Sequence, residues 1–239
     1  MMKIMKGFKG NWIRHGFETL YVIVGILVAF SLDDWNESRK AQNRELSVLK
    51  EIISGLSSDS STLNFNISKH NQAIKSCEIV FKTLDEAEEY NDTLAFHFAA
   101  IHYYTVFASS RGPYESLKSM GFESISNKSL KFEIINLYDQ WYSTLQTNQN
   151  ILIEDIHSLK RNFHQNHFDK FLVLIPQPPY YGGEMIPVNF KQLKVNQQYR
   201  YHIRSLKASH SNYNFMNRFV GDKVENLINS CQEEIKRLK

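Results

Sequence analysis

The feature that most constrains this chain is an apolar run near its N-terminus. Residues 19–32 place 14 consecutive uncharged side chains in the chain. As a helix this run is about 21 Å long, shorter than the roughly 30 Å hydrocarbon core of a bilayer. Extending it from Trp12 to Trp35 gives about 35 Å and puts an indole ring at each membrane surface. The sequence therefore predicts a transmembrane helix over residues 17–35 that uses its flanks.

The charged and small residues of this helix carry further expectations. Arg14 and Glu18 are four apart and share a helix face, so a local pair at the membrane edge is expected. A sharper interpretation makes Glu18 a working intramembrane carboxylate. A small-xxx-small pattern at Gly25 and Ala29 predicts close helix approach and self-association. The candidate anchor residues are Trp12, Arg14, Glu18, Gly25, Ala29 and Trp35.

Two other interpretations of the run stay open. A basic leader, a short apolar core and the tripeptide Ala29-Phe30-Ser31 also fit a signal peptide that is cleaved after Ser31. An apolar run of this length is also compatible with the buried core helix of a soluble protein.

The distribution of charge predicts an orientation. Residues 1–16 contain four basic side chains and no acidic one, whereas the formal net charge of the whole chain is only +3. Under the positive-inside rule, residues 1–16 are a cytoplasmic leader and residues 36–239 form a domain on the far side of the membrane. That domain is nearly neutral, so composition offers no case for nucleic acid as a partner. The expected partner is the lipid bilayer.

A heptad pattern follows the apolar run. From Leu46 to Leu84 the seam residues recur at alternating spacings of three and four, with Ser60 and His70 as its polar members. This pattern predicts one helix of about 50 residues that packs against other helices, continuous through the serine-rich residues 57–62. Similar spacing predicts long helices over residues 128–173 and 197–238, the first capped by Asn127 or Ser129.

Shorter helices are expected between these rods. They cover residues 93–107 with Asp92 as the cap, residues 114–120 between Pro113 and Gly121, and residues 189–196. The predicted fold is all-α: an N-terminal transmembrane helix continuing into an elongated antiparallel bundle of three long helices, with a cap of short helices at the distal end. In this arrangement residues 85–127 form the cap, the second long helix returns to the membrane and the third rises again. The proline-rich loop after residue 175 would then bring Tyr180 and Tyr181 to the membrane surface.

Two stretches resemble an uncharacterised family of short bacterial membrane proteins, known only as a domain of unknown function. They are ETLYVIVGILVA at residues 18–29 followed by DWNE at 34–37, and PYESLKSMG at residues 113–121 followed by ISN at 125–127. The resemblance implies a single uncleaved anchor and an extracytoplasmic helical domain, and it implies no activity. Asp33 and Asp34 depart from the amides expected at the outer edge of the span.

The chain has two cysteines, Cys77 and Cys231. In the predicted arrangement they lie at similar heights on the first and third long helices, so a disulfide is one expectation in an oxidising compartment. The alternative is two buried thiols that act as small apolar residues.

Other candidate sites are weaker. The imidazoles of His157, His164 and His167 could hold a divalent metal, although a solvated helix face explains them as well. Residues Tyr114, Glu115, Lys118 and Gly121 could form a partner or cap loop, or a structural turn. No nucleotide-binding, hydrolase or metalloprotease motif occurs, so no cofactor is expected.

The leading hypothesis is a non-enzymatic periplasmic interaction or scaffold module that binds an unknown protein or a second copy through the anchor and heptad helices. The alternatives are a channel or energised-transport subunit that uses Glu18, and a ligand sensor that acts through a partner.

Overall fold

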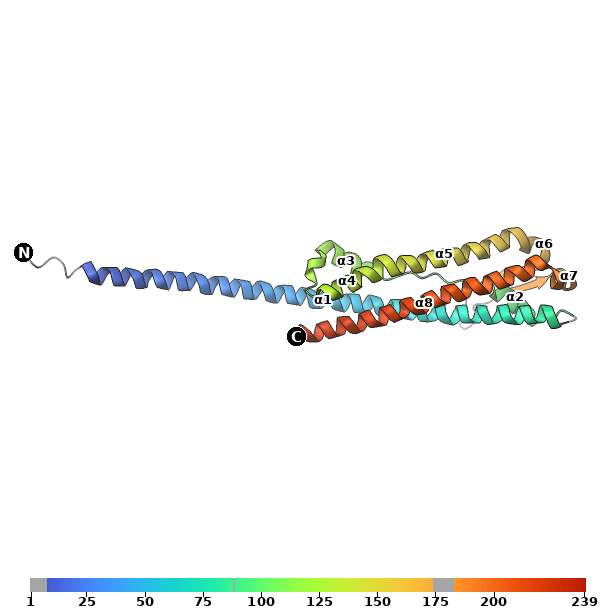
Figure 1. Cartoon of the computed structure of the whole chain (residues 1–239), viewed down its shortest axis with the longest axis horizontal. Helices are drawn as coiled ribbons and strands as arrows, with labels where there is room; N and C mark the ends of the chain where they lie inside the picture. Colours follow the sequence, from blue (N-terminus) through green and yellow to red (C-terminus); the bar gives the residue numbers. More distant parts are fainter. Residues whose placement is uncertain (1–7, 88, 174–182) are drawn as a thin grey trace, which may run out of the picture.

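The computed structural model describes residues 8–87, 89–173 and 183–239, with side chains from residue 15 onward except those of residues 170–173. One helix dominates it (Figure 1). Helix α1 (Phe8–Glu86) is 79 residues long and has no break. Residues 15–44 of α1 are exposed on all sides, and the bundle begins at Glu45, which is buried. The end of the bundle at Glu45 is called the proximal end below, and the end at Glu86 the distal end.

The serine-rich stretch of α1 stays helical, as predicted. The hydroxyl groups of Ser57, Ser61 and Thr62 each donate to the carbonyl group four residues earlier, at 2.8, 3.0 and 3.2 Å respectively. These bonds satisfy the hydroxyls without competing for the amide groups of the helix. The apolar stripe therefore keeps its phase from Leu49 through Leu63 to Leu84, all of which are buried.

The predicted seam is half right. Its residues at one heptad position are buried, namely Leu49, Leu56, Leu63, His70, Cys77 and Leu84. The second buried line of α1 lies one residue before the predicted one: Glu45, Ile52, Asp59, Asn66, Ala73 and Val80. Three members of this line, Glu45, Asp59 and Asn66, are polar, so a search for hydrophobic spacing does not detect it.

After α1 the chain turns at the distal end and runs back along the bundle. Helix α2 (Leu94–Ala100) is short, and residues 103–111 are extended. Nine extended residues reach about 30 Å, and they bring helix α3 (Gly112–Met120) to the proximal end (Figure 1). The predicted helix over residues 93–107 is therefore wrong beyond Ile101. Asp92 is not its cap; Asn91 accepts from the amide of Thr93 instead.

The second rod then runs outward. It consists of η1 (Phe122–Ser124), α4 (Lys128–Ile135), η2 (Asn136–Trp141), α5 (Tyr142–Leu159), η3 (Lys160–His164) and α6 (Gln165–His167). The side chain of Asn127 accepts from the amides of Ser129 and Leu130, as predicted for the cap. The segments η2 and η3 are π-helical turns, which shift the phase of the side chains that follow.

The rod ends earlier than predicted. Strand β1 (Phe168–Val173) pairs antiparallel with β2 (Gly183–Pro187), with Phe168 opposite Pro187 and Val173 opposite Gly183. This hairpin packs on α2 at the distal end. Tyr180 and Tyr181 lie outside the described residues, but the strands that flank them are at the opposite end from the predicted membrane surface.

Helix α7 (Phe190–Val195), capped by Asn189, leads into α8 (Gln197–Arg237). Helix α8 runs from the distal to the proximal end beside α1 (Figure 1). The all-α class with three long helices is confirmed, and α2, α7 and the hairpin form the distal cap. The predicted directions are wrong: the second rod runs parallel to α1, and α8 is the one that returns. The extended segment 103–111 causes the difference. It carries the chain back to the proximal end before the second rod begins, so the second rod runs outward.

Candidate functional site

The α1/α8 interface keeps one antiparallel register along its length. Gln42 donates to the carbonyl of Leu238 at the proximal end, Asn66 donates to Asn217 at 3.3 Å in the middle, and Asp85 pairs with Arg200 at the distal end. Helix α8 is amphipathic and buries residues such as Ile203, Leu206, Val220, Val224 and Leu227 against α1 and α5. The first of the two features that follow surrounds the middle of this interface, and the second lies near its distal end.

The first feature is a buried polar core around the extended segment. An extended segment inside a bundle exposes backbone groups that secondary structure does not satisfy. Asp59 accepts from the amide of Ser110 at 2.7 Å, and Gln149 accepts from the amide of Phe107 at 2.7 Å. Asp59 is 1% and Gln149 2% exposed, so both side chains serve the interior. These polar residues hold the segment between the helices.

Aromatic hydroxyls complete these contacts. The hydroxyl of Tyr142 donates to Asp59 at 2.6 Å, and that of Tyr213 donates to Gln149 at 3.2 Å. Burial, and then the adjacent Asp59 carboxylate, raise the pKa of Tyr142 far above its usual value. Tyr142 therefore stays a proton donor, and the network is arranged for structure rather than for proton transfer.

Two fully buried histidines sit at the centre of the core. The Nδ1 atoms of His70 and His210 are 2.9 Å apart, and Nε2 of His210 lies 3.0 Å from the carbonyl of Ile101. A carbonyl only accepts, so His210 carries its proton on Nε2 and accepts on Nδ1 from His70. Nε2 of His70 then accepts from the Thr105 hydroxyl at 2.9 Å. Both rings are neutral, in agreement with burial lowering the pKa of His70 to about 3 and that of His210 to about 4.

A second histidine pair lies beside the first. The rings of His102 and His164 meet edge to face with centroids 4.2 Å apart, and Nδ1 of His102 donates to the carbonyl of Phe98 at 2.9 Å. Burial lowers the pKa of His164 to about 4 and that of His102 well below its usual value. Four neutral imidazoles thus occupy one region of the interior.

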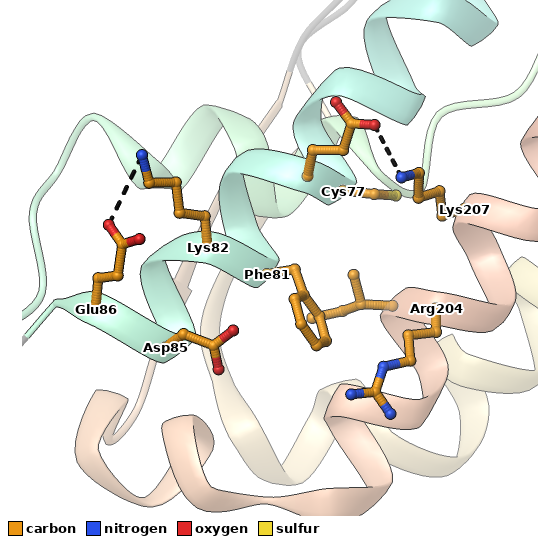
Figure 2. Close-up of a pocket in the computed structure, with 9 residues that line it drawn as sticks. Cys77, Phe81, Lys82, Asp85, Glu86, Arg204 and Lys207 are labelled. Atoms are coloured by element: carbon orange, nitrogen blue, oxygen red, sulfur yellow. Dashed lines mark ion pairs between the residues drawn. The ribbon is translucent and has the colours of Figure 1, made fainter.

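The second feature is a groove between α1 and α8 near the distal end, with a volume of about 440 Å³ (Figure 2). Cys77 and Ile203, both buried, line its inner part, and Phe81 presents its ring between the two helices. The rim is charged, with Glu78, Lys82, Asp85 and Glu86 from α1 and Arg204 and Lys207 from α8. Burial raises the pKa of the Cys77 thiol to about 12, so it is not a nucleophile at neutral pH.

The predicted disulfide between Cys77 and Cys231 is not present. Both thiols are free and buried. Because α8 is antiparallel to α1, Cys231 lies near the proximal end beside Glu234, whereas Cys77 lies beside Lys207. The two cysteines are about 39 Å apart along the bundle on the rise of a helix. The alternative expectation, buried thiols acting as apolar residues, describes both.

The three predicted metal-ligand histidines do not converge. His157 contacts Tyr104, His164 contacts His102, and His167 stacks on Phe163 at 3.8 Å between ring centroids. The π-helical turn η3 lies between the first and last of them and changes their relative direction. Within the described ranges, no three His, Cys, Asp or Glu side chains are arranged to hold a metal ion.

The predicted partner loop divides into two kinds of residue. Tyr114 is buried, stacks on Tyr138 at 4.5 Å between centroids, and donates to Asp139 at 2.8 Å. Gly121 ends α3 with φ +91°, a backbone conformation that favours glycine. These two residues build the turn, whereas Glu115 and Lys118 are exposed on α3 and remain candidates for a partner contact.

The anchor residues lie on the exposed part of α1. Glu18 pairs with His15 at 3.0 Å from Nδ1 to Oε2. The side chains of Trp12 and Arg14 fall outside the described part. A Cβ atom added at Gly25 would meet nothing within 4 Å, and Ala29 and Trp35 are exposed. Among the residues that the structure describes, none packs against the apolar surface of this segment.

Pattern analysis missed the groove and most of the polar core. His70 was visible as a polar member of the heptad seam, and that was the one local signal of the core. Asp59, Gln149 and His210 look like ordinary solvated residues in the sequence. Their partners lie on other elements, so only the folded arrangement reveals them.

Fold and site define an elongated α-helical bundle whose first helix is long and apolar enough near the N-terminus to cross a membrane. A family model described as a family of unknown function, DUF6090, matches residues 18–174. The chain belongs to this family, which confirms the resemblance. The matched range includes the apolar segment, the extended segment and the second rod, and α8 lies beyond it. No curated protein and no solved structure matches the chain.

Proposed function

We propose that this protein is a single-pass, non-enzymatic scaffold of the bacterial inner membrane, with residues 1–16 in the cytoplasm, residues 17–35 in the bilayer and residues 36–239 in the periplasm. The observation that carries this proposal is the continuity of α1. One unbroken helix joins the apolar segment to the core of the bundle. A continuous helix is a stiff connection, so the bundle would stand at a fixed position relative to the membrane.

Exposure of the apolar segment supports the membrane assignment. Every large apolar side chain from Phe17 to Trp35 is at least 48% exposed. A contiguous apolar surface of this kind needs lipid or a protein partner. The alternative of a buried core helix loses support, because none of the apolar window is buried within the chain.

The reach of α1 supports a spacing role. From Trp35 to Glu86 the helix extends about 77 Å. The distal cap and groove would then lie far from the membrane, and a partner bound there would be held at a defined distance. A second copy could associate through Gly25 and Ala29, where small side chains leave the helix backbone accessible.

Topology is tested with two reporter fusions at Lys239. Alkaline phosphatase is active only outside the cytoplasm, and green fluorescent protein exported by the same route is dark, so the two fusions control one another. We expect an active phosphatase fusion, a dark fluorescent fusion, and an intact mass that includes residues 1–31. Fluorescence without phosphatase activity, or an intact mass that corresponds to a chain starting at Leu32, would overturn the proposed anchor.

Self-association is tested by oxidative crosslinking in membranes. Gly25→Cys should give a disulfide-linked dimer, whereas Leu27→Cys, about 200° around the helix, should not. The native cysteines are buried and do not interfere. Equal crosslinking at both positions would indicate random collision, and the absence of crosslinking at Gly25 would leave the scaffold without a self-association face.

A further inference from the structure

The groove between α1 and α8 has an uncompensated cation. Each of its three carboxylates already has a cationic partner: Glu78 pairs with Lys207 at 2.8 Å, Glu86 with Lys82 at 3.7 Å, and Asp85 with Arg200. Arg204 forms no ion pair or hydrogen bond with the residues that the structure describes. Its guanidinium carbon lies 4.8 Å from the centroid of the Phe81 ring. Counted with Arg200, which pairs with Asp85 from outside the groove lining, there are four cations and three carboxylates here, so one positive charge is left without an acidic partner.

The aromatic ring orients that charge. Arg200 also lies 4.8 Å from the Phe81 centroid, so one ring contacts two guanidinium groups. Arg200 is held by Asp85, which leaves Arg204 as the group with open donors. In Figure 2 the Phe81 ring lies between the Asp85 carboxylate and the Arg204 guanidinium. A planar guanidinium held against an aromatic ring presents its N–H edge to an incoming ligand.

We propose that this groove binds a small organic monocarboxylate, with its carboxylate on Arg204 and its apolar body against Phe81 and Ile203. A guanidinium fork matches the two oxygens of a carboxylate. The volume of about 440 Å³ suits a small molecule. Among the described residues that line the groove, Arg204 alone is a cation without an acidic partner, which matches the single charge of a monocarboxylate and not the double charge of phosphate. Because the Cys77 thiol stays protonated, binding is non-covalent.

This inference goes beyond the scaffold role and gives the distal end a chemical specificity. A ligand in the groove would contact α1 and α8 together, two helical turns beyond the His70 and His210 pair. It would therefore strengthen the contact between α1 and α8 near the distal cap.

The probe is benzoate, titrated calorimetrically into the full chain in nanodiscs, with benzamide as the neutral analogue of the same shape. We expect benzoate to bind at millimolar or lower concentration, and benzamide to bind at least about tenfold more weakly. Arg204→Gln should weaken benzoate binding by about tenfold or more. The matched control is Arg218→Gln, an exposed arginine on the same helix outside the groove, and it should leave binding unchanged.

Two further readouts keep the result specific. Phe81→Leu should weaken benzoate binding while leaving helical circular dichroism unchanged, because the Phe81 side chain is only half-buried. Inorganic phosphate at the same concentration should not displace benzoate. Equal binding by the wild type and Arg204→Gln, equal binding of benzamide, displacement by phosphate, or no benzoate binding up to about 10 mM would each overturn the proposal. Partition of benzoate into lipid is the same for both arginine variants and cancels in the comparison.

Discussion

His70 on α1 and His210 on α8 face each other through their Nδ1 atoms, 2.9 Å apart and without solvent contact. The pair can accept one proton without losing a bond. His70 would then donate from Nε2 to the Thr105 oxygen and accept on Nδ1 from a doubly protonated His210. A second proton would place two N–H groups against each other, with like charges in a buried site. Burial disfavours even the first proton, because a charged imidazolium has no solvent here, so the pair is neutral at neutral pH.

Stability should fall as the pH drops through about 6.5, the pKa at which a histidine of the unfolded chain is half protonated. In the folded protein the pKa values of His70 and His210 are lower, at about 3 and about 4. The unfolded chain therefore binds more protons between these values and pH 6.5, and acid favours the unfolded state over the folded one. Each histidine of the pair should cost about 1.6 kcal/mol between pH 6.5 and pH 5, and His102 and His164, whose pKa values burial also lowers, should add losses of the same sign. Urea unfolding followed by circular dichroism at pH 7.5, 6.5 and 5 measures this loss. A free energy of unfolding that is flat or rises toward pH 5 would contradict the neutral pair. His157→Gln, which alters a half-buried histidine outside the pair, should keep the pH dependence.

Asp59→Ala should destabilise the bundle strongly. The substitution removes the acceptor for both the Ser110 amide and the Tyr142 hydroxyl, which are left buried. We expect a loss of about 3 to 4 kcal/mol, and a smaller loss for Asp59→Asn, which keeps one oxygen acceptor. Chemical denaturation at pH 7.5 measures both, with the exposed Glu115→Gln as a control near zero. If Asp59→Ala and Glu115→Gln have the same free energy of unfolding, the extended segment is not held by Asp59.

Both cysteines should remain thiols after purification in air. Their separation along the bundle forbids an intramolecular bond, and burial raises both pKa values to about 12. Iodoacetamide at pH 8 should label neither residue in the folded protein and both in urea, as read by intact mass. A non-reducing digest that contains a peptide linking Cys77 to Cys231 would contradict the antiparallel placement of α8.

Two glycine substitutions should act in opposite directions. Gly121→Ala forces a side chain into a backbone with φ +91° and should cost about 1 to 3 kcal/mol. Gly221→Ala lies inside α8 with nothing within 4 Å of the added methyl group, and it should stabilise the protein by about 1 kcal/mol. Thermal unfolding of the two variants side by side provides the comparison. Equal shifts of the midpoint would contradict the described backbone conformation of at least one of the two glycines.

The extended segment shows why sequence analysis placed the rods in the wrong order. Residues 101–107 continue an apolar run and contain β-branched and aromatic residues that fit either a helix or a strand. Gln149 and Asp59 stabilise the extended conformation, because their side chains accept hydrogen bonds from amides of this segment although they lie on other elements. No local pattern contains that information. The early end of the second rod has a similar cause, since residues 168–173 form a strand because β2 pairs with them.

The candidate site divides in the same way. Sequence alone determined one of the two buried stripes of α1, the stripe of α8, the cap at Asn127, and the apolar segment at residues 17–35. These features depend on side-chain spacing and on hydrogen bonds within a few residues. Only the tertiary structure decided that Cys77 faces the start of α8, that His70 meets His210, and that Arg204 lies over Phe81. A heptad stripe packs equally well against a parallel or an antiparallel neighbour, so the direction of α8 was fixed by the path of the chain between the helices.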